Sequence, residues 1–381
     1  MTTVSFNPGL KVKQSKPLQQ QQAASDMQSA PDASLKSIAN PSLLKVYFAG
    51  NFNYEQAQAG LKGAPPEHII EAIKNSKTGN KSVLSIAKEI NAERKKLGQE
   101  PLFEIKKDLE TEKEYLDLSG YNYDGINMAG ADLSSTDLSE AYFRDVNLTG
   151  ANLSETILKD TNLKGARLSE ASLDKAILNR TNLYKAILPS TTIRGAHFAE
   201  ANLEDADFSE AKLQGATFIK SVLNGANMSD SNLEGAEFKA DISDKEIDQG
   251  EYTNINTLKH TNLTNANLQG ATFKYSDLSY AILKKANCQG ASFLEADLDS
   301  ADIKEADLTN ADLSYSNLHV ANLKGANLTN TKFIGADIRG ANLEETQRGI
   351  ANIEEDPNFK DIIIDKNTTI TIKNKSEYKY T

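Results

Sequence analysis

The sequence predicts an all-β solenoid preceded by a small helical region. A large apolar residue stands at nearly every position whose number ends in 3 or 8, from Leu118 to Leu343. The five-residue units read A-[DN]-L-x-x, as in A-N-L-S-E at 151–155. About 25 such units run from Leu118 to Phe238, and about 18 more run from Leu258 to Leu343. The first hundred residues lack this period.

A period of five fits neither regular secondary structure. An α-helix places apolar residues about 3.6 apart and a strand places them about 2 apart. Within one unit in extended backbone, the central Leu and the Ala two places earlier share a face, while the Asp or Asn between them points the other way. A chain that turns a corner after each unit therefore becomes a coil with a filled interior, and each coil pairs with the next.

The repeat resembles that of the pentapeptide-repeat proteins and covers roughly 60% of the chain. The resemblance implies a right-handed quadrilateral β-helix with four units in each coil, and with the central residue and its Ala partner inside. At the ~4.8 Å spacing between strands, about 43 units would make nearly eleven coils and a rod roughly 50 Å long.

Residues twenty apart should then stack in columns. Phe198, Phe218 and Phe238 fall on one predicted column, and Phe273 and Phe293 fall on another. Aromatic rings that stack on their own kind gain contact energy beyond simple burial.

Composition limits the classes of protein that the chain can belong to. The one cysteine, Cys288, stands in a central position and is predicted to be a buried apolar residue, so no disulfide forms within the chain. No apolar run is long enough to span a membrane, and the first thirty residues lack the core of a signal peptide. The net charge is −11, and residues 101–381 carry 45 acidic against 29 basic residues.

Two segments precede the repeat. Residues 1–40 are rich in Gln, Ser, Ala and Pro, and we expect them to be disordered. Residues 41–114 show a helical period, with a helix after Pro66, a second capped by Ser82, and a third from Glu104 to Tyr115. Because the end of a solenoid exposes apolar side chains, this region is either a cap or a separate binding module.

The repeat domain, 115–349, is interrupted at 239–257. Ser243, Asp248 and Thr253 occupy slots that belong to apolar residues. The missing span of twenty residues predicts that the register resumes on the same face, either through one distorted coil or around a projecting loop. The acidic residues of this segment are candidate partner-binding residues: Asp241, Asp244, Glu246, Asp248 and Glu251.

Residues 350–381 are predicted to form a C-terminal cap and tail. Residues 362–364 and 368–372 each read as a short strand. The two strands either close the last coil or pair with a second chain, so a homodimer through an end of the rod stays open.

Acidic residues in the polar slot before the central residue make a second candidate partner-binding set. Columns of twenty bring Asp277, Asp297 and Asp337 into line with Asn317, and a run around one coil continues from Asp297. That run adds Asp302, Asp307 and Asp312. Stacked carboxylates repel unless water, counterions or a partner relieve them, so the column is either a solvated face or a binding surface.

The sequence offers no chemistry for an enzyme. We find no nucleophile with a base, no carboxylate pair in a cleft and no cofactor loop, and a filled solenoid has no pocket. The four histidines suggest no metal set, so neither a metal nor a cofactor is expected. The predicted function is a rigid acidic scaffold that binds a protein partner.

The resemblance adds two contexts for that function. Bacterial effectors in the family pair an N-terminal unstructured or helical region with a repeat rod, which implies a protein of the bacterial cytoplasm or one secreted into a host cell without a cleaved signal peptide. The alternative is a quinolone-resistance member that mimics DNA and occupies a topoisomerase. Such members are mostly repeat, whereas more than a hundred residues precede the repeat here. Direct binding of nucleic acid is not expected.

Overall fold

The computed structural model of the chain describes residues 62–78, 80–240, 255–347, 360–364 and 368–372. All of them belong to one compact unit, which comprises Tyr54–Ala240 and Ile255–Thr381. The described elements are α2 (Glu67–Ser76), α3 (Val83–Lys96), β1 (Ile105–Lys107), β2 (Glu114–Asp117), β3 (Thr136–Asp137), β4 (His197–Ala199), β5 (Thr217–Ile219), β6 (Glu237–Lys239), β7 (Asn342–Thr346) and β8 (Thr369–Ile372). The predicted disorder of 1–40 lies outside the described residues.

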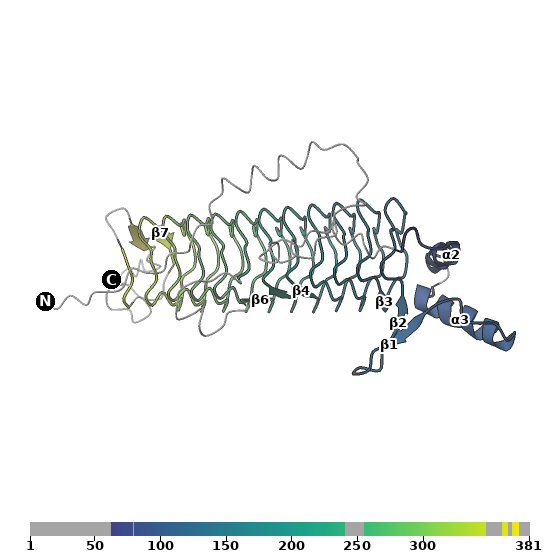
Figure 1. Cartoon of the computed structure of the whole chain (residues 1–381). Helices are drawn as coiled ribbons and strands as arrows, with labels where there is room; N and C mark the ends of the chain where they lie inside the picture. The colour runs from purple at the N-terminus through teal and green to yellow at the C-terminus, as the bar shows by residue number, and fades with distance from the viewer. Residues whose placement is uncertain (1–61, 79, 241–254, 348–359, 365–367, 373–381) are drawn as a thin grey trace, which may run out of the picture. The chain divides into compact units, whose positions relative to one another are not determined.

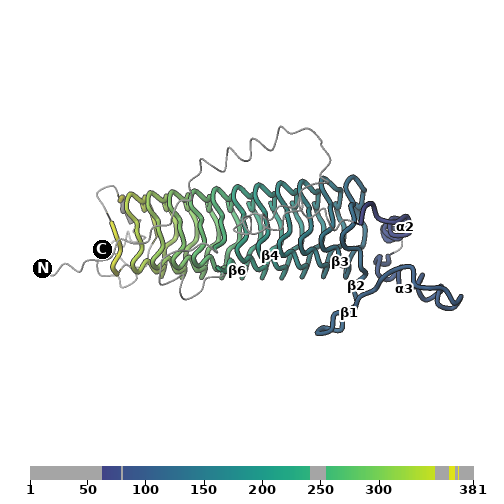
Figure 2. The backbone as a smooth tube through the Cα atoms, in the orientation of Figure 1, coloured from purple at the N-terminus to yellow at the C-terminus, as the bar shows by residue number. Residues whose placement is uncertain are grey.

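The repeat winds into coils of twenty residues that lie side by side (Figures 1 and 2). Parallel bridges join Asp132 to Asn152 and Asn152 to Ser172. The Asn152 amide donates to the carbonyl of Ala131 (2.9 Å), and its carbonyl accepts from the amide of Leu133 (2.8 Å). Each coil contains four such bridging positions, for example residues 147, 152, 157 and 162. The predicted β-solenoid is therefore confirmed, and its partners in neighbouring coils are twenty residues apart.

The interior is filled by the central residues and their small partners, as predicted. One column of rings runs through it: Phe198, Phe218, Phe238, Phe273 and Phe293. Their successive centroids are 4.8, 4.5, 4.5 and 5.1 Å apart, and each ring is less than 2% exposed. The prediction of two separate Phe columns is wrong, because Phe238 stacks directly on Phe273.

The same stacking corrects the register across the interruption. The coils on either side of it are direct neighbours, since the Leu223 amide donates to Thr257 (2.7 Å) and the Phe238 amide donates to Thr272 (2.8 Å). Partners here are thirty-five residues apart instead of twenty, as in the bridge from Val222 to Thr257. The interruption therefore adds fifteen residues. The register resumes one face later, not on the same face, and a distorted coil is excluded.

Asn256 closes the gap where the chain returns. It occupies the slot of the small residue and is completely buried. Its side-chain nitrogen Nδ2 donates to the carbonyls of Lys239 (3.0 Å) and Phe218 (3.2 Å), and its side-chain oxygen Oδ1 accepts from the backbone amide of Ser221 (2.9 Å). The Asn256 side chain therefore joins the residue before the interruption to the residue after it, and joins both to the preceding coil.

The N-terminal region caps the first coil. Lys62 donates its amide to Gly120 (2.8 Å), and β2 pairs in parallel with β3. The Lys77 ammonium donates to the carbonyl of Asn127 (2.6 Å), while Asp132 pairs with the Ser76 hydroxyl and the Val83 amide. Backbone groups that would stay unpaired at the end of a solenoid therefore have partners, which favours a cap over a separate module.

The helical prediction for this region is right for two elements and wrong for a third. Ser82 caps α3 by accepting the amide of Ser85 (3.2 Å), as expected. Residues 104–115 form no helix, because β1 and β2 make an antiparallel hairpin there. Its turn is fixed by Asp108, whose carboxylate accepts the amide of Thr111 (2.7 Å). A local Asx turn of this kind competes with helix formation.

At the C-terminal end the last rungs pair with the preceding coil. Ile363 bridges to Asp337, and β8 pairs in parallel with β7. The two predicted strands therefore each extend the stack and do not pair with one another, which favours closure of the last coil.

Candidate functional site

The candidate residues divide into three groups in the structure. Asp241, Asp244, Glu246, Asp248 and Glu251 lie outside the described residues. Bridges connect Thr257, Asp277, Asp297, Asn317 and Asp337 in sequence, and we call this row the carboxylate column. Asp302, Asp307 and Asp312 follow Asp297 around its coil, so the bridges place each on a different face from the carboxylate column. The candidates therefore form one column and three separate positions, not one surface.

The aspartates of the carboxylate column make more hydrogen bonds and ion pairs than the sequence predicts. Asp277 is only 5% exposed. One of its carboxylate oxygens accepts from the amide (3.1 Å) and hydroxyl (2.7 Å) of Ser279, and the other lies 3.0 Å from the Lys259 ammonium. The carboxylate therefore fixes the turn of its own unit, and its charge is balanced by a lysine from the preceding coil.

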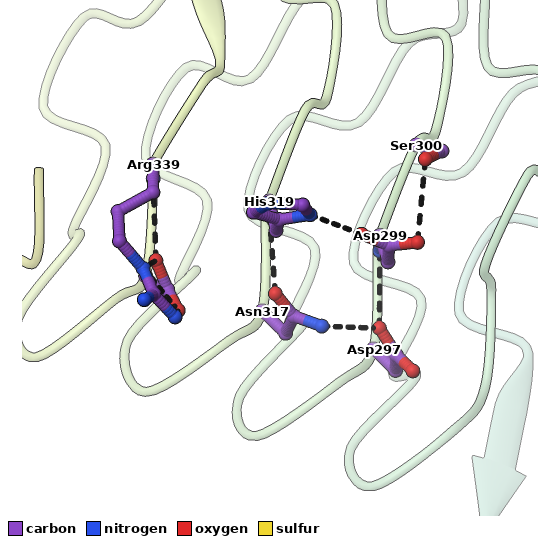
Figure 3. A network of polar contacts seen from close by, with 7 residues as sticks. Asp297, Asp299, Ser300, Asn317, His319 and Arg339 are labelled. Atoms are coloured by element: carbon purple, nitrogen blue, oxygen red, sulfur yellow. Dashed lines mark hydrogen bonds and ion pairs between the residues drawn. The ribbon is translucent and has the colours of Figure 1, made fainter. Parts of the chain in front are cut away.

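Asp297 lies at the centre of the column and has no cation beside it among the described residues. Its Oδ1 accepts from the Asp299 amide (3.0 Å) and from Nδ2 of Asn317 (2.9 Å), as Figure 3 shows. Burial raises the pKa of Asp297, and the negative charges of Asp277 and Asp299 raise it further. Negative charge is thus less well compensated here than at the ends of the column.

Asp299 and His319 extend this network beside the column (Figure 3). Nδ1 of His319 lies 2.8 Å from Oδ1 of Asp299, and the Ser300 hydroxyl donates to Oδ2 (3.2 Å). Both residues follow a central position and are twenty apart, so the rule that found the column could also have found this pair. The pair lies outside the predicted candidate residues, which all occupy the slot before the central residue or the interruption.

Asp337 is the last residue of the column, and its negative charge is balanced by an ion pair. Nε and a terminal nitrogen of Arg339 contact its two oxygens at 2.9 and 2.5 Å. Burial opposes ionisation, but the hydrogen bonds and charge of Arg339 outweigh it and hold the pKa of Asp337 below its ordinary value.

The three positions outside the column are also engaged. Asp302 and Asp312 lie 3.0 and 4.0 Å from the ammonium groups of Lys284 and Lys332. Asp307 accepts from Thr309 and Gln289, and these hydrogen bonds lower its pKa although burial opposes them. Each of these carboxylates stands on a face of its own and could bind one further cation. Every face carries both acidic and basic residues.

Two other kinds of site have no support in the described ranges. No group of three or more metal-ligating side chains gathers there, and no helix in them has the length and apolar character needed to cross a membrane. Burial strongly raises the pKa of the Cys288 thiol, which is completely buried and therefore suited to packing.

Comparison with known proteins places the repeat in a family. A model described as pentapeptide repeats matches residues 126–165, 161–199, 201–239, 257–287, 276–314 and 311–346. No relative was found among curated proteins.

Several solved structures are similar. HetL, a pentapeptide repeat protein of the cyanobacterium Nostoc sp. strain PCC 7120 involved in regulating heterocyst differentiation, is 29% identical; the match covers 69% of this chain and 97% of HetL at a TM-score of 0.32. Full-length QnrB1, a plasmid-mediated fluoroquinolone resistance protein, is 17% identical, with 60% and 94% covered at a TM-score of 0.24. Neither likeness carries an argument about function. The family model spans more than half of the sequence, and the chain belongs to the pentapeptide-repeat family.

Proposed function

We propose that the chain is a non-enzymatic scaffold that binds a protein partner through the outward side chains of its coils. The observation that carries this proposal is the fixed position of the carboxylate column over a filled interior. Groups available for recognition lie on the outside, in rows set by the bridges between coils. Such a surface is rigid before binding, so little entropy is lost when a partner docks.

The centre of the column supports a partner with basic side chains. Lys259 and Arg339 balance Asp277 and Asp337, whereas Asp297 and Asp299 share only polar neighbours and His319. Burial raises the pKa of Asp297 most and repulsion from Asp277 and Asp299 raises it further; a lysine or arginine of the partner would relieve that repulsion.

Affinity capture with the full chain tests this surface. The bait is compared with a variant that carries Asp297→Asn and Asp299→Asn, which keeps most hydrogen bonds and removes two charges. A matched control carries Asp132→Asn and Asp207→Asn on other columns. A partner that is retained by the control and lost from the column variant supports the proposal. Equal capture by all three baits would refute it.

The segment 241–254 is a second proposed contact. Because the interruption adds fifteen residues, excision of 241–255 joins Ala240 to Asn256 and keeps the coils in register. Loss of capture on excision, with an unchanged circular dichroism spectrum, would assign part of the partner contact to this segment. Unchanged capture would remove it from the site.

We also infer that the coils are right-handed and four-sided. The four bridging positions in each coil support the four sides. A left-handed path or a three-sided section in a crystal structure would contradict this inference.

The context of the scaffold follows from the N-terminal segment. We propose that residues 1–40 govern delivery, so that the protein acts in the bacterial cytoplasm or after secretion into a host cell. A translocation reporter fused to these residues should reach the host cell, and failure to leave any secreting bacterium would count against the proposal.

Mimicry of duplex DNA at a topoisomerase is the second candidate. The in-register carboxylates of the column favour it, since duplex DNA carries about one charge per 1.7 Å. The cations beside Asp277 and Asp337 reduce the charge density of the column. A gyrase supercoiling assay separates the candidates: salt-sensitive inhibition that is lost with Asp297→Asn and Asp299→Asn favours mimicry.

A further inference from the structure

A basic patch interrupts the acidic surface on two neighbouring coils. Lys164 and Arg167 lie on one coil, and Tyr184, Lys185 and Ile187 lie on the next. Bridges join residue 162 to 182 and residue 167 to 187, so these side chains are neighbours across the coils. We call these five residues the basic patch. They are separate from the carboxylate column, which begins after the interruption.

The cations of the basic patch have no close ion-pair partner among the described residues, although Glu204 and Asp205 on the next coil attract Lys185. Within the described ranges, Lys164, Arg167 and Lys185 form no ion pair, although Arg144, Arg180 and Arg194 nearby each pair with an aspartate. The ammonium groups of Lys164 and Lys185 lie over the ring of Tyr184, at 5.5 and 5.0 Å from its centroid. These three cations therefore lie together without an ion pair, in a chain with a net charge of −11.

An apolar side chain lies beside these cations. Ile187 is 41% exposed, although the residues before and after it are buried. An isolated exposed isoleucine is ordinary on a protein surface. Together with Tyr184 and Arg167, however, it gives the patch an apolar, an aromatic and a guanidinium group, and Tyr and Arg are enriched at protein interfaces.

The surroundings decide which class of anion fits. Asp145 follows Arg144 on the coil before, and Glu204 and Asp205 stand on the coil after. A continuous polyanion such as nucleic acid would meet these carboxylates on both sides of the patch. A short peptide can instead place its acidic side chains between them. Ile187 also needs an apolar group opposite it, which a phosphate backbone does not supply.

We propose that the basic patch docks a short acidic segment of a partner protein, with an apolar side chain of that segment packed on Ile187 and Tyr184. The proposal rests on the scaffold function and names a second surface for it, with charge opposite to that of the carboxylate column. A partner with separate acidic and basic segments could then bind both surfaces of one chain.

Fluorescence anisotropy with the full chain tests the proposal. The probe is a labelled eight-residue peptide of six glutamates around a central Leu-Phe pair, and we expect saturable binding that weakens as salt rises. A triple variant, Lys164→Glu, Arg167→Glu and Lys185→Glu, should bind about tenfold or more weakly. A control with the same charge change, Lys95→Glu, Lys159→Glu and Lys212→Glu, should retain most of the affinity. Ile187→Ser should weaken binding without any change of charge.

Each other outcome overturns the proposal. Equal loss in the patch and control variants would mean that only net charge matters. Tighter binding of an oligothymidine with equal charge, or of vesicles that contain phosphatidylserine, would assign the patch to another class of ligand. Binding that occurs only after excision of 241–255 would assign it to that acidic segment of the chain itself. If the peptide fails to bind while capture through the carboxylate column persists, this inference fails and the proposed function stands.

Discussion

At the scale of single residues, the Asp or Asn before each central position has a structural role that explains why the repeat requires it. Asn152 shows the pattern, since its side-chain oxygen accepts the amide of Ser154 two residues later (3.1 Å). Its nitrogen donates to Asp132 in the preceding coil (3.1 Å). A short polar side chain therefore stabilises both the turn within a unit and the contact between coils.

The pKa shifts predict opposite effects of pH at two positions of the carboxylate column. The folded pKa of Asp297 is raised, so its contribution to the free energy of unfolding is present below the unfolded pKa and is lost as pH rises through the folded pKa. The Asp297→Asn variant should therefore gain stability relative to the parent as pH rises from about 3.5 to 7.

Asp337 supplies the matched control for this prediction. Its folded pKa is lowered, so its contribution is present above the unfolded pKa and is lost as pH falls. The Asp337→Asn variant should be less stable than the parent at neutral pH, and the difference should shrink in acid. Thermal denaturation across the pH range measures both effects, and two curves with the same slope would contradict the assignment.

Among the residues at the interruption, Asn256 is expected to contribute most to the free energy of unfolding. Asn256→Ala leaves the carbonyls of Lys239 and Phe218 and the amide of Ser221 without their buried partner. We expect the free energy of unfolding to fall by about 2–4 kcal/mol. Urea denaturation checks this value, and Gln269→Ala, at an exposed position of the regular repeat, is the control that should change little. Similar small losses in both variants would show that Asn256 does not hold the joint.

At the scale of elements, the interruption between β6 and the next coil is an insertion into an otherwise continuous stack. Phe238 and Phe273 stay in ring contact across it, at a centroid distance of 4.5 Å. In the regular repeat, one unit of five residues leads from a central position to the next one. Twenty residues lead from Phe238 to Leu258, so the interruption adds fifteen.

Excision therefore gives different results for different lengths. Removal of the fifteen residues 241–255 should leave cooperative thermal unfolding, with a midpoint close to that of the parent. Removal of the twenty residues 241–260 shifts every later unit by one face, so Phe238 loses Phe273 as its partner and the midpoint should fall. Differential scanning calorimetry of both variants checks the register, and the opposite order of stability would contradict it.

The sequence predicts some elements of the fold correctly and others not, and the difference has physical causes. The period of five predicts a coil with a filled interior, because the central position of every unit is buried. The coil of twenty residues is what the resemblance to pentapeptide-repeat proteins implies. The register across the interruption depends on how many residues leave the stack, and residues 239–257 carry no period from which to count. The third expected helix fails because the Asp108 turn competes with it. The rule of twenty places Asp299 beside His319, whereas the 2.8 Å contact between their side chains depends on rotamers that the sequence does not specify.

At the scale of the molecule, the described unit is a capped stack that carries both the carboxylate column and the basic patch. The N-terminal region covers the first coil, while the last described rungs, around Ile363 and β8, extend the C-terminal end. A homodimer through that end stays a prediction. The carboxylate column and the basic patch lie on different parts of one rigid stack, so their separation is fixed and a partner must match it.

Cysteine cross-linking tests the register of these outward side chains most directly. Asp230 and Asn265 contact each other at 3.0 Å across the interruption, and Asn310 and Asn330 do so at 3.2 Å within the regular repeat. Cysteines at either pair should form a disulfide under mild oxidation, because the buried native Cys288 does not compete. A pair at positions 230 and 310 should not. Cross-linking at 310 and 330 without cross-linking at 230 and 265, read by mass spectrometry, would contradict the continuous stack on which the proposed scaffold depends.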